Sequence, residues 1–142
     1  MASNTVYDAI KARLDPVEGG SWSTTPIRWE NDSLADPTDD HWIYVEMTGT
    51  LYAQMSIGAG AQTDNRFDEE GLLWIHVMAK TGIGTQTARQ YAKQIADIFR
   101  GVTLLSGNLE FLDARIGRGV PGESDGQWWR LPIEIEWRRM EA

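Results

Sequence analysis

The sequence predicts an α+β fold, a mixed, mostly antiparallel sheet of about six strands with two helices packed on one face. Two observations lead to this prediction. Short runs of alternating apolar and polar residues recur along the chain, as in half-buried strands. Residues 85–100 instead repeat apolar residues at helical spacing, as do residues 4–14. With 142 residues and 42% hydrophobic content, we expect one domain spanning residues 1–142.

A helix is predicted near the start of the chain, because apolar residues recur there on one helical face. Either Ser3 or Asn4 can cap its first free amides, and Pro16 ends it. Residues 15–25 are rich in Gly, Ser and Thr and predict a loop, and residues 26–31 predict a short strand.

The next predicted unit is a hairpin between two polar loops. Residues 32–40 are acidic and contain proline, which is typical of a surface loop. Residues 41–47 and 51–57 both alternate, and a connection at 48–50 with a central Gly favours an antiparallel hairpin. Residues 58–70 then predict a long loop, and a loop of this length in a small domain is usually functional or mobile.

The clearest pattern is a strand at 71–80, a turn at 82–84 and an amphipathic helix that ends at Gly101. The apolar stripe of this helix covers the sheet and consists of Ala88, Tyr91, Ala92, Ile95, Ile98 and Phe99. The opposite face carries three basic residues that are available to a neighbouring molecule, Arg89, Lys93 and Arg100.

The remaining residues predict a second hairpin, a loop and a last strand. The hairpin joins residues 102–105 to 108–114, and the loop spans 115–127. The strand at 129–138 alternates large apolar and charged residues. It contains Pro132, which cannot donate a ladder hydrogen bond. We therefore expect this strand near an edge, or its empty amide position facing solvent.

The two histidines are the first candidates for catalysis or metal binding. His76 shares its predicted strand face with apolar residues, so we interpret it as structural rather than as a catalytic base. His41 follows Asp39 and Asp40, but three adjacent residues cannot easily surround one ion. We therefore expect no metal and no cofactor.

Other catalytic patterns are weak. The chain has no Cys, which excludes disulfides, thiolate nucleophiles and thiolate metal sites. The pairs Glu69 with Glu70 and Glu134 with Glu136 fit solvated surface positions better than acid–base roles. The turn at 82–84 lacks the third Gly and the Lys of phosphate-binding loops. We expect no enzymatic activity.

Charge argues for protein partners rather than nucleic acid. The net charge of −8 disfavours a broad phosphate-binding surface. Residues 1–70 carry 13 acidic and 4 basic side chains, whereas residues 71–142 carry 8 and 9. This asymmetry allows two copies to meet head to tail, although it is also what a solvated acidic face would give.

Tryptophan usage points the same way. Trp22, Trp42 and Trp128 fall in predicted loops or on the more polar strand faces, whereas Trp74, Trp129 and Trp137 fit a core. Exposed Trp beside Arg is typical of a protein interface, so we expect self-association.

Several short motifs follow one another in a defined order: Tyr7-Asp8-Ala9-Ile10, Ile27-Arg28-Trp29-Glu30-Asn31, Arg66-Phe67, Gly71-Leu72-Leu73-Trp74-Ile75-His76-Val77, Gly82-Ile83-Gly84, Ala96-Asp97-Ile98-Phe99 and Asp125-Gly126-Gln127-Trp128-Trp129. This order resembles the tail terminator or tail completion proteins of long-tailed bacteriophages and gene transfer agents, the group similar to the lambda tail terminator. The resemblance covers nearly the whole chain as a pattern of elements.

The resemblance implies a structural virion protein that forms a hexameric ring, caps the tail tube, ends tail elongation and offers a docking face to the head-to-tail connector. Its partners would be further copies of itself, the tail tube protein and the connector or stopper protein. DNA would pass through the lumen without specific binding. Its place would be the head-proximal end of the tail, after assembly in the host cytoplasm. No signal peptide or membrane association is expected.

For such a ring we expect the functional contacts in the loops 58–70 and 115–127 and on seven candidate interface residues: Arg66, Arg89, Arg100, Arg115, Arg118, Trp42 and Trp128. Two alternatives stay open. The chain could be a head-closure or tail-tube subunit. It could also be a small hydrolase, or a ligand-binding module that stacks ligands on Trp.

Overall fold

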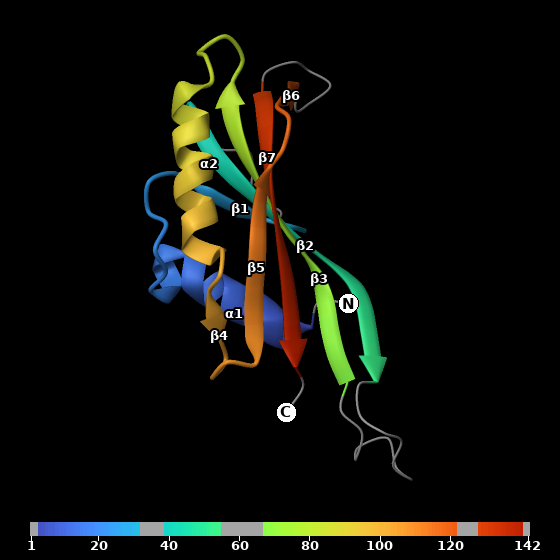
Figure 1. Cartoon of the computed structure of the whole chain (residues 1–142). Helices are drawn as coiled ribbons and strands as arrows, with labels where there is room; N and C mark the ends of the chain where they lie inside the picture. Colours follow the sequence, from blue (N-terminus) through green and yellow to red (C-terminus); the bar gives the residue numbers. More distant parts are fainter. Residues whose placement is uncertain (1–2, 32–38, 55–66, 122–127, 141–142) are drawn as a thin grey trace.

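The computed structural model describes residues 3–31, 39–54, 67–121 and 128–140. These residues form two helices, a short 3-10 turn and seven strands, arranged as one twisted sheet with both helices on one side (Figure 1). The elements in chain order are α1 (Asn4–Leu14), η1 (Pro16–Glu18), β1 (Ile27–Trp29), β2 (His41–Gln54), β3 (Phe67–Lys80), α2 (Gln86–Phe99), β4 (Thr103–Leu104), β5 (Leu109–Ile116), β6 (Val120–Pro121) and β7 (Trp128–Met140).

The sheet is mixed and mostly antiparallel, which confirms the predicted α+β fold. Its strands run in the order β1-β2-β3-β7-β5-β4, and β6 pairs with β7 beyond the end of β5. β1 and β2 are parallel, whereas the other paired strands are antiparallel.

The main core lies between the helices and one face of the sheet. α1 contributes Val6, Ile10 and Leu14, and α2 contributes its predicted apolar stripe, with Phe99 packed against Phe111 of β5. The sheet side of this core consists of alternate residues from β2, β3, β5 and β7: Ile43, Val45, Met47, Leu73, Ile75, Val77, Ala79, Leu109, Phe111, Leu131, Ile133, Ile135 and Trp137. The helices therefore cover one face, as the two hydrophobic patterns required.

The predicted hairpin at 48–50 is wrong. Residues 41–54 form a single long strand, β2, which pairs along its whole length with β3. The pairing shifts register between Gly49 and Leu51, so the extra residue is held in a bulge rather than a turn. A Gly inside alternating residues is compatible with both structures, and the distant partner β3 decides between them.

The predicted loop at 58–70 is also wrong at its end, because β3 begins at Phe67. Residues 55–66 lie outside the described part of the chain, as do residues 32–38 of the first predicted surface loop. The predicted loop at 115–127 is shorter than expected. Arg115 and Ile116 belong to β5, residues 120–121 form β6, and residues 122–127 lie outside the description.

The expectation that the strand with Pro132 lies near an edge is wrong. β7 is central, between β3 on one side and β5 and β6 on the other. Pro132 falls where the neighbour of β7 changes from β5 to β6, since Ile133 pairs with Ile116 and Arg130 with Val120. The carbonyl of Pro132 accepts a hydrogen bond from the amide of Gly117 in this short connection. The missing donor therefore interrupts no continuous ladder.

Helix ends follow the predicted signals. α1 begins directly after Ser3, although the Ser3 side chain makes no capping hydrogen bond, and it ends before Pro16. After α2, Gly101 adopts a left-handed conformation with φ of 67°. Neither described helix has the length and apolar composition needed to span a membrane.

Candidate functional site

The face of the sheet opposite the helices is the candidate site. In the described part of the chain no helix covers it (Figure 1). It is formed by the even-numbered residues of β2, β3 and β7 that face away from α1 and α2. We call it the helix-free face. Its side chains include Trp42, Tyr44, Glu46, Leu72, Trp74, His76, Met78, Trp128, Arg130, Glu134, Glu136 and Arg138.

One end of the helix-free face carries an aromatic cluster that the sequence did not predict. Trp42 and Trp128 pack edge to face, with ring centroids 5.5 Å apart, and both contact Met78 between them. Their exposed fractions are 4% and 6%, so the expectation that they are exposed is wrong. The strand order places β3 between their strands, and the two large rings bury each other across it. Their role in an interface stays a prediction.

Two further tryptophans differ from expectation. Trp22 is buried rather than exposed. It packs edge to face on Tyr91 of α2, and its indole N–H donates to Thr25 Oγ1 over 2.9 Å. Trp74 does not join the core but lies half-buried on the helix-free face. Trp137 is in the core as predicted.

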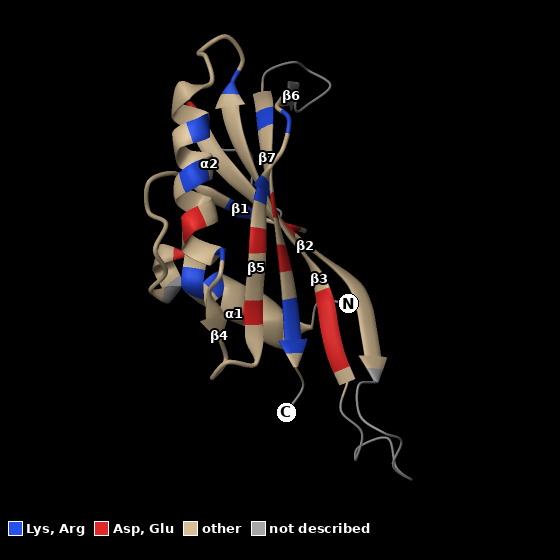
Figure 2. Cartoon of the chain, viewed as in Figure 1, with Lys and Arg blue, Asp and Glu red and all other residues tan. Residues whose placement is uncertain are grey.

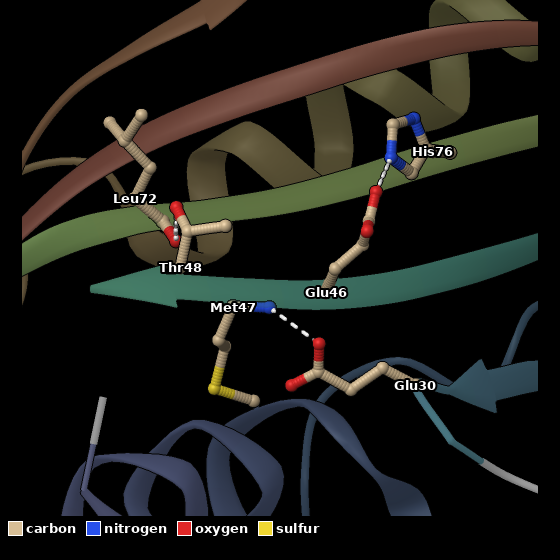
Figure 3. A network of polar contacts seen from close by, with 6 residues as sticks. All are labelled: Glu30, Glu46, Met47, Thr48, Leu72 and His76. Carbon is tan, nitrogen blue, oxygen red and sulfur yellow. Dashed lines mark hydrogen bonds and ion pairs between the residues drawn. The ribbon is translucent and has the colours of Figure 1, made fainter. Parts of the chain in front are cut away.

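His76 is held between aromatic rings at the middle of the helix-free face. Its imidazole stacks on Trp74 and Tyr44, with centroids 6.2 and 6.0 Å away, and its Nε2 lies 2.6 Å from Glu46 Oε1 (Figure 3). His76 is buried, as expected for a structural histidine. Its Nδ1 is buried and has no hydrogen-bond partner among the described residues.

Burial lowers the pKa of His76 below its ordinary value. The hydrogen bond and the charge of Glu46 raise the pKa, and the charge of Arg130 lowers it, but desolvation is the largest effect. A neutral ring with its proton on Nε2 donates to Glu46 and leaves Nδ1 as a bare acceptor. A second proton would place an unpaired N–H in the buried site.

His76 therefore makes folding pH-dependent. Because the folded pKa is lower than the unfolded pKa of about 6.5, the unfolded chain takes up a proton first as the pH falls. The stability is complete above that pH and decreases as the pH falls toward the folded pKa. We expect His76→Gln, which keeps a donor for Glu46, to remove this part of the loss in urea unfolding between pH 7.5 and 5. Equal pH dependence in the variant and wild type would contradict this assignment.

The other end of the helix-free face is hollow and acidic. A hollow of about 430 Å³ lies beside Gly71 and is lined by side chains from β2, β3, β5 and β7. Its charged lining consists of Glu70, Glu134, Glu136 and Arg138, and the exposed Leu112 lies at its margin. Glu136 pairs with Arg115 at 3.5 Å, whereas Glu70 and Glu134 make no ion pair with a described residue. We call this the acidic hollow.

Two ion pairs with buried carboxylates join β3 to β7 beside the acidic hollow. Asp68 pairs with Arg138 on the helix-free face, and Glu69 pairs with Arg139 on the helix side, both at 3.3 Å. Glu69 is 1% exposed and also accepts a hydrogen bond from the Ser3 amide, so its predicted solvated position is wrong. Neighbouring residues of a strand face opposite sides of the sheet, so Asp68 and Glu69 point to different faces. On each face, an arginine of β7 pairs with the acidic residue of β3.

The exposed side of α2 is basic, as predicted. Figure 2 shows Lys and Arg along this helix. The residues that line the acidic hollow lie on the opposite face of the sheet. Lys93 and Arg100 share Asp97, each at 2.7 Å, and their proximity lowers the Asp97 pKa, with the Lys93 hydrogen bond as the largest cause. Arg89 contacts only the Thr85 hydroxyl among described residues, at 3.2 Å. Arg89 is therefore the cation of α2 without a carboxylate partner in this part of the chain.

The remaining candidates do not gather at one place. Arg115 lies on β5 by the acidic hollow, Arg118 lies in the exposed connection between β5 and β6, and Arg66 is outside the described residues. The six candidate interface residues that the structure describes thus do not form one surface. Sequence reasoning missed the acidic hollow, because its residues come together only through the β2-β3-β7-β5 order.

Two segments of the sequence are candidate chemical motifs, the acidic residues before His41 and the glycine turn at 82–84. Within the described ranges, no group of three His, Asp or Glu side chains is placed to hold a metal ion. Asp40 instead pairs with Lys80 at 3.3 Å. The turn at 82–84 adjoins a hollow of about 450 Å³ that is lined by Lys80, Thr81, Thr85, Trp128 and Trp129. The apolar part of this lining comes from the two tryptophans.

Comparison with known proteins supports the resemblance drawn from the sequence. The family model of the phage tail terminator protein matches residues 5–137. One solved structure matches 100% of this chain and 97% of its own, with a TM-score of 0.69 and 19% sequence identity, and at that identity it supports the fold alone. No curated protein gave a significant match. Because the family model spans nearly the whole chain, the protein belongs to the phage tail terminator family, a family of structural proteins of the virion tail.

Proposed function

We propose that the protein assembles into a hexameric ring that caps the tail tube, ends its elongation and provides the docking face for the head-to-tail connector. The observation that carries this proposal is the family match over residues 5–137. In the virion, the ring would occupy the head-proximal end of the tail, after assembly in the host cytoplasm. Its partners would be its own copies, the tail tube protein and the connector or stopper protein.

The two faces of the sheet support a ring rather than a symmetric dimer. One face carries helices with a basic outer side (Figure 2), and the other carries the aromatic cluster and the acidic hollow. Surfaces this different favour heterologous contacts, in which one face of a subunit meets another face of its neighbour. Such contacts close into rings when the rotation between neighbours permits it.

The charge of the protein fits a channel for DNA. A net charge of −8 on each subunit gives the ring a negative field, so DNA would pass through the lumen without specific binding. Six such subunits also repel one another, and we expect salt or divalent cations to favour assembly by screening. Sizing across ionic strength measures this dependence.

Imaging with tail-tube subunits tests the proposed function. We expect negative-stain images of the purified protein to show rings, and rings to sit at one end of each tube when tube subunits are present. Tubes grown with the protein should also be shorter than tubes grown without it. Long tubes built from this protein alone would indicate a tube subunit, and binding to the connector without tube capping would indicate a head-closure protein. Monomers in every sample would contradict the ring.

A further inference from the structure

We infer that neighbouring subunits meet through the acidic hollow of one copy and the basic side of α2 of the next, with Arg89 entering the hollow. This inference rests on the proposed ring and names the surfaces that form it. The molecule that enters the hollow is a second copy of this chain. Three observations lead to it: unpaired charges on the two surfaces, the shape of the hollow and the placement of the surfaces on opposite faces.

The charges of the two surfaces are complementary. Glu70 and Glu134 have no cationic partner among the described residues, and both line the hollow. On α2, Asp97 forms ion pairs with both Lys93 and Arg100. Arg89 is exposed and, among the described residues, contacts only the hydroxyl group of Thr85. A planar guanidinium offers several donors in a fixed fork and can bridge two carboxylates. Arg89 thus has no carboxylate partner among the described residues, and the hollow offers two carboxylates without a cation.

The shape of the hollow suits a side chain from another protein. Its volume of about 430 Å³ is ample for an arginine side chain. Its lining includes Gly71 and Leu72, and its margin includes Leu112, which is 42% exposed. The methylene groups of an inserted Arg can pack on these apolar atoms while the head reaches the carboxylates. The contact would therefore combine burial of apolar area with charge pairing.

The position of the two surfaces allows the contact to repeat. α2 lies on one side of the sheet, and the acidic hollow opens on the other. A subunit that uses its α2 on one neighbour keeps its hollow free for the next. Each subunit then makes the same two contacts, as a closed ring requires.

Charge reversal on each surface tests this contact. We expect Arg89→Glu and Glu134→Arg each to weaken ring formation about tenfold or more, because each places like charges at the contact. The double variant Arg89→Glu/Glu134→Arg should recover rings, since the pair is restored with its signs exchanged. Mass photometry over a concentration series measures the assembly. Asp8→Arg is the matched control, because Asp8 is an exposed carboxylate on α1 and its reversal should leave the rings intact.

Each outcome bears on a different claim. Rings that persist in both single variants, or a double variant that fails to recover while circular dichroism shows it folded, would overturn this interface and leave the ring itself standing. Single variants that form rings but no longer cap tubes would assign the hollow to the tail tube protein and overturn the inference. A wild-type protein that stays monomeric at every concentration would overturn both the ring and this contact.

Discussion

Replacing Gly71 by Ala is expected to destabilise the fold by about 3 kcal/mol or more. A Cβ at this position would overlap the carbonyl oxygen of Thr48 and lie 2.5 Å from Cζ2 of Trp137. The Thr48 oxygen belongs to the backbone of β2 next to its bulge, so it cannot move without breaking strand pairing. Trp137 is in the core, so its ring cannot move without disturbing the packing. The absence of a side chain at Gly71 thus leaves room for both the Thr48 carbonyl and the Trp137 indole.

Urea unfolding of Gly71→Ala measures this effect. Gly117→Ala is the matched control, because its new Cβ would meet the Cγ atom of Pro132 at 3.0 Å, and the proline ring can pucker away. We expect the control to lose no more than about 1 kcal/mol. Gly71 also lines the acidic hollow, so its variant should lose rings together with stability. Similar stabilities for the two variants would show that the bulge tolerates a side chain.

Replacing Arg139 by Met is expected to cost about 3–5 kcal/mol, because it leaves the buried carboxylate of Glu69 without its cation. Glu69 is 1% exposed and would retain only the hydrogen bond from the Ser3 amide. A charge in this environment has lost its water and cannot recover it without opening the end of the sheet. The loss should therefore far exceed that of a surface ion pair.

Two further variants separate the buried charge from the lost side chain. Glu69→Leu/Arg139→Met removes both charges and should regain most of the stability, since apolar replacements of a buried pair are often neutral or better. Lys93→Met breaks a pair with exposed Asp97 and should change the free energy of unfolding far less than Arg139→Met does. If Arg139→Met were as mild as Lys93→Met, the Glu69 pair would contribute nothing specific.

The spacing of apolar residues was enough to predict the type and the buried face of single elements. The stripe of α2 and the alternation of β7 fixed the period and the buried face of these elements, and Gly101 marked a helix end. The Gly49 region was misread because a turn and a bulge share the same residues. Only the pairing of β2 with β3 along both halves decides for the bulge.

The candidate site was less predictable, because strand order creates it. Trp42 and Trp128 looked exposed since nothing local shows that β3 brings them together. One missed signal was present in the sequence. Consecutive acids at 68–69 and consecutive bases at 138–139 lie at the ends of two alternating strands, and such a match indicates cross-strand pairing on both faces. That match would have predicted β3 beside β7.

The central place of β7 has a consequence for the timing of synthesis. β7 is synthesised after the other described strands, yet it lies between β3 and β5. Until it emerges, the facing edges of both strands lack their partner, and the carboxylates that β7 brings to the acidic hollow do not exist. A nascent chain therefore cannot present a finished subunit surface. Synthesis of β7 thus precedes the contact that we propose between subunits.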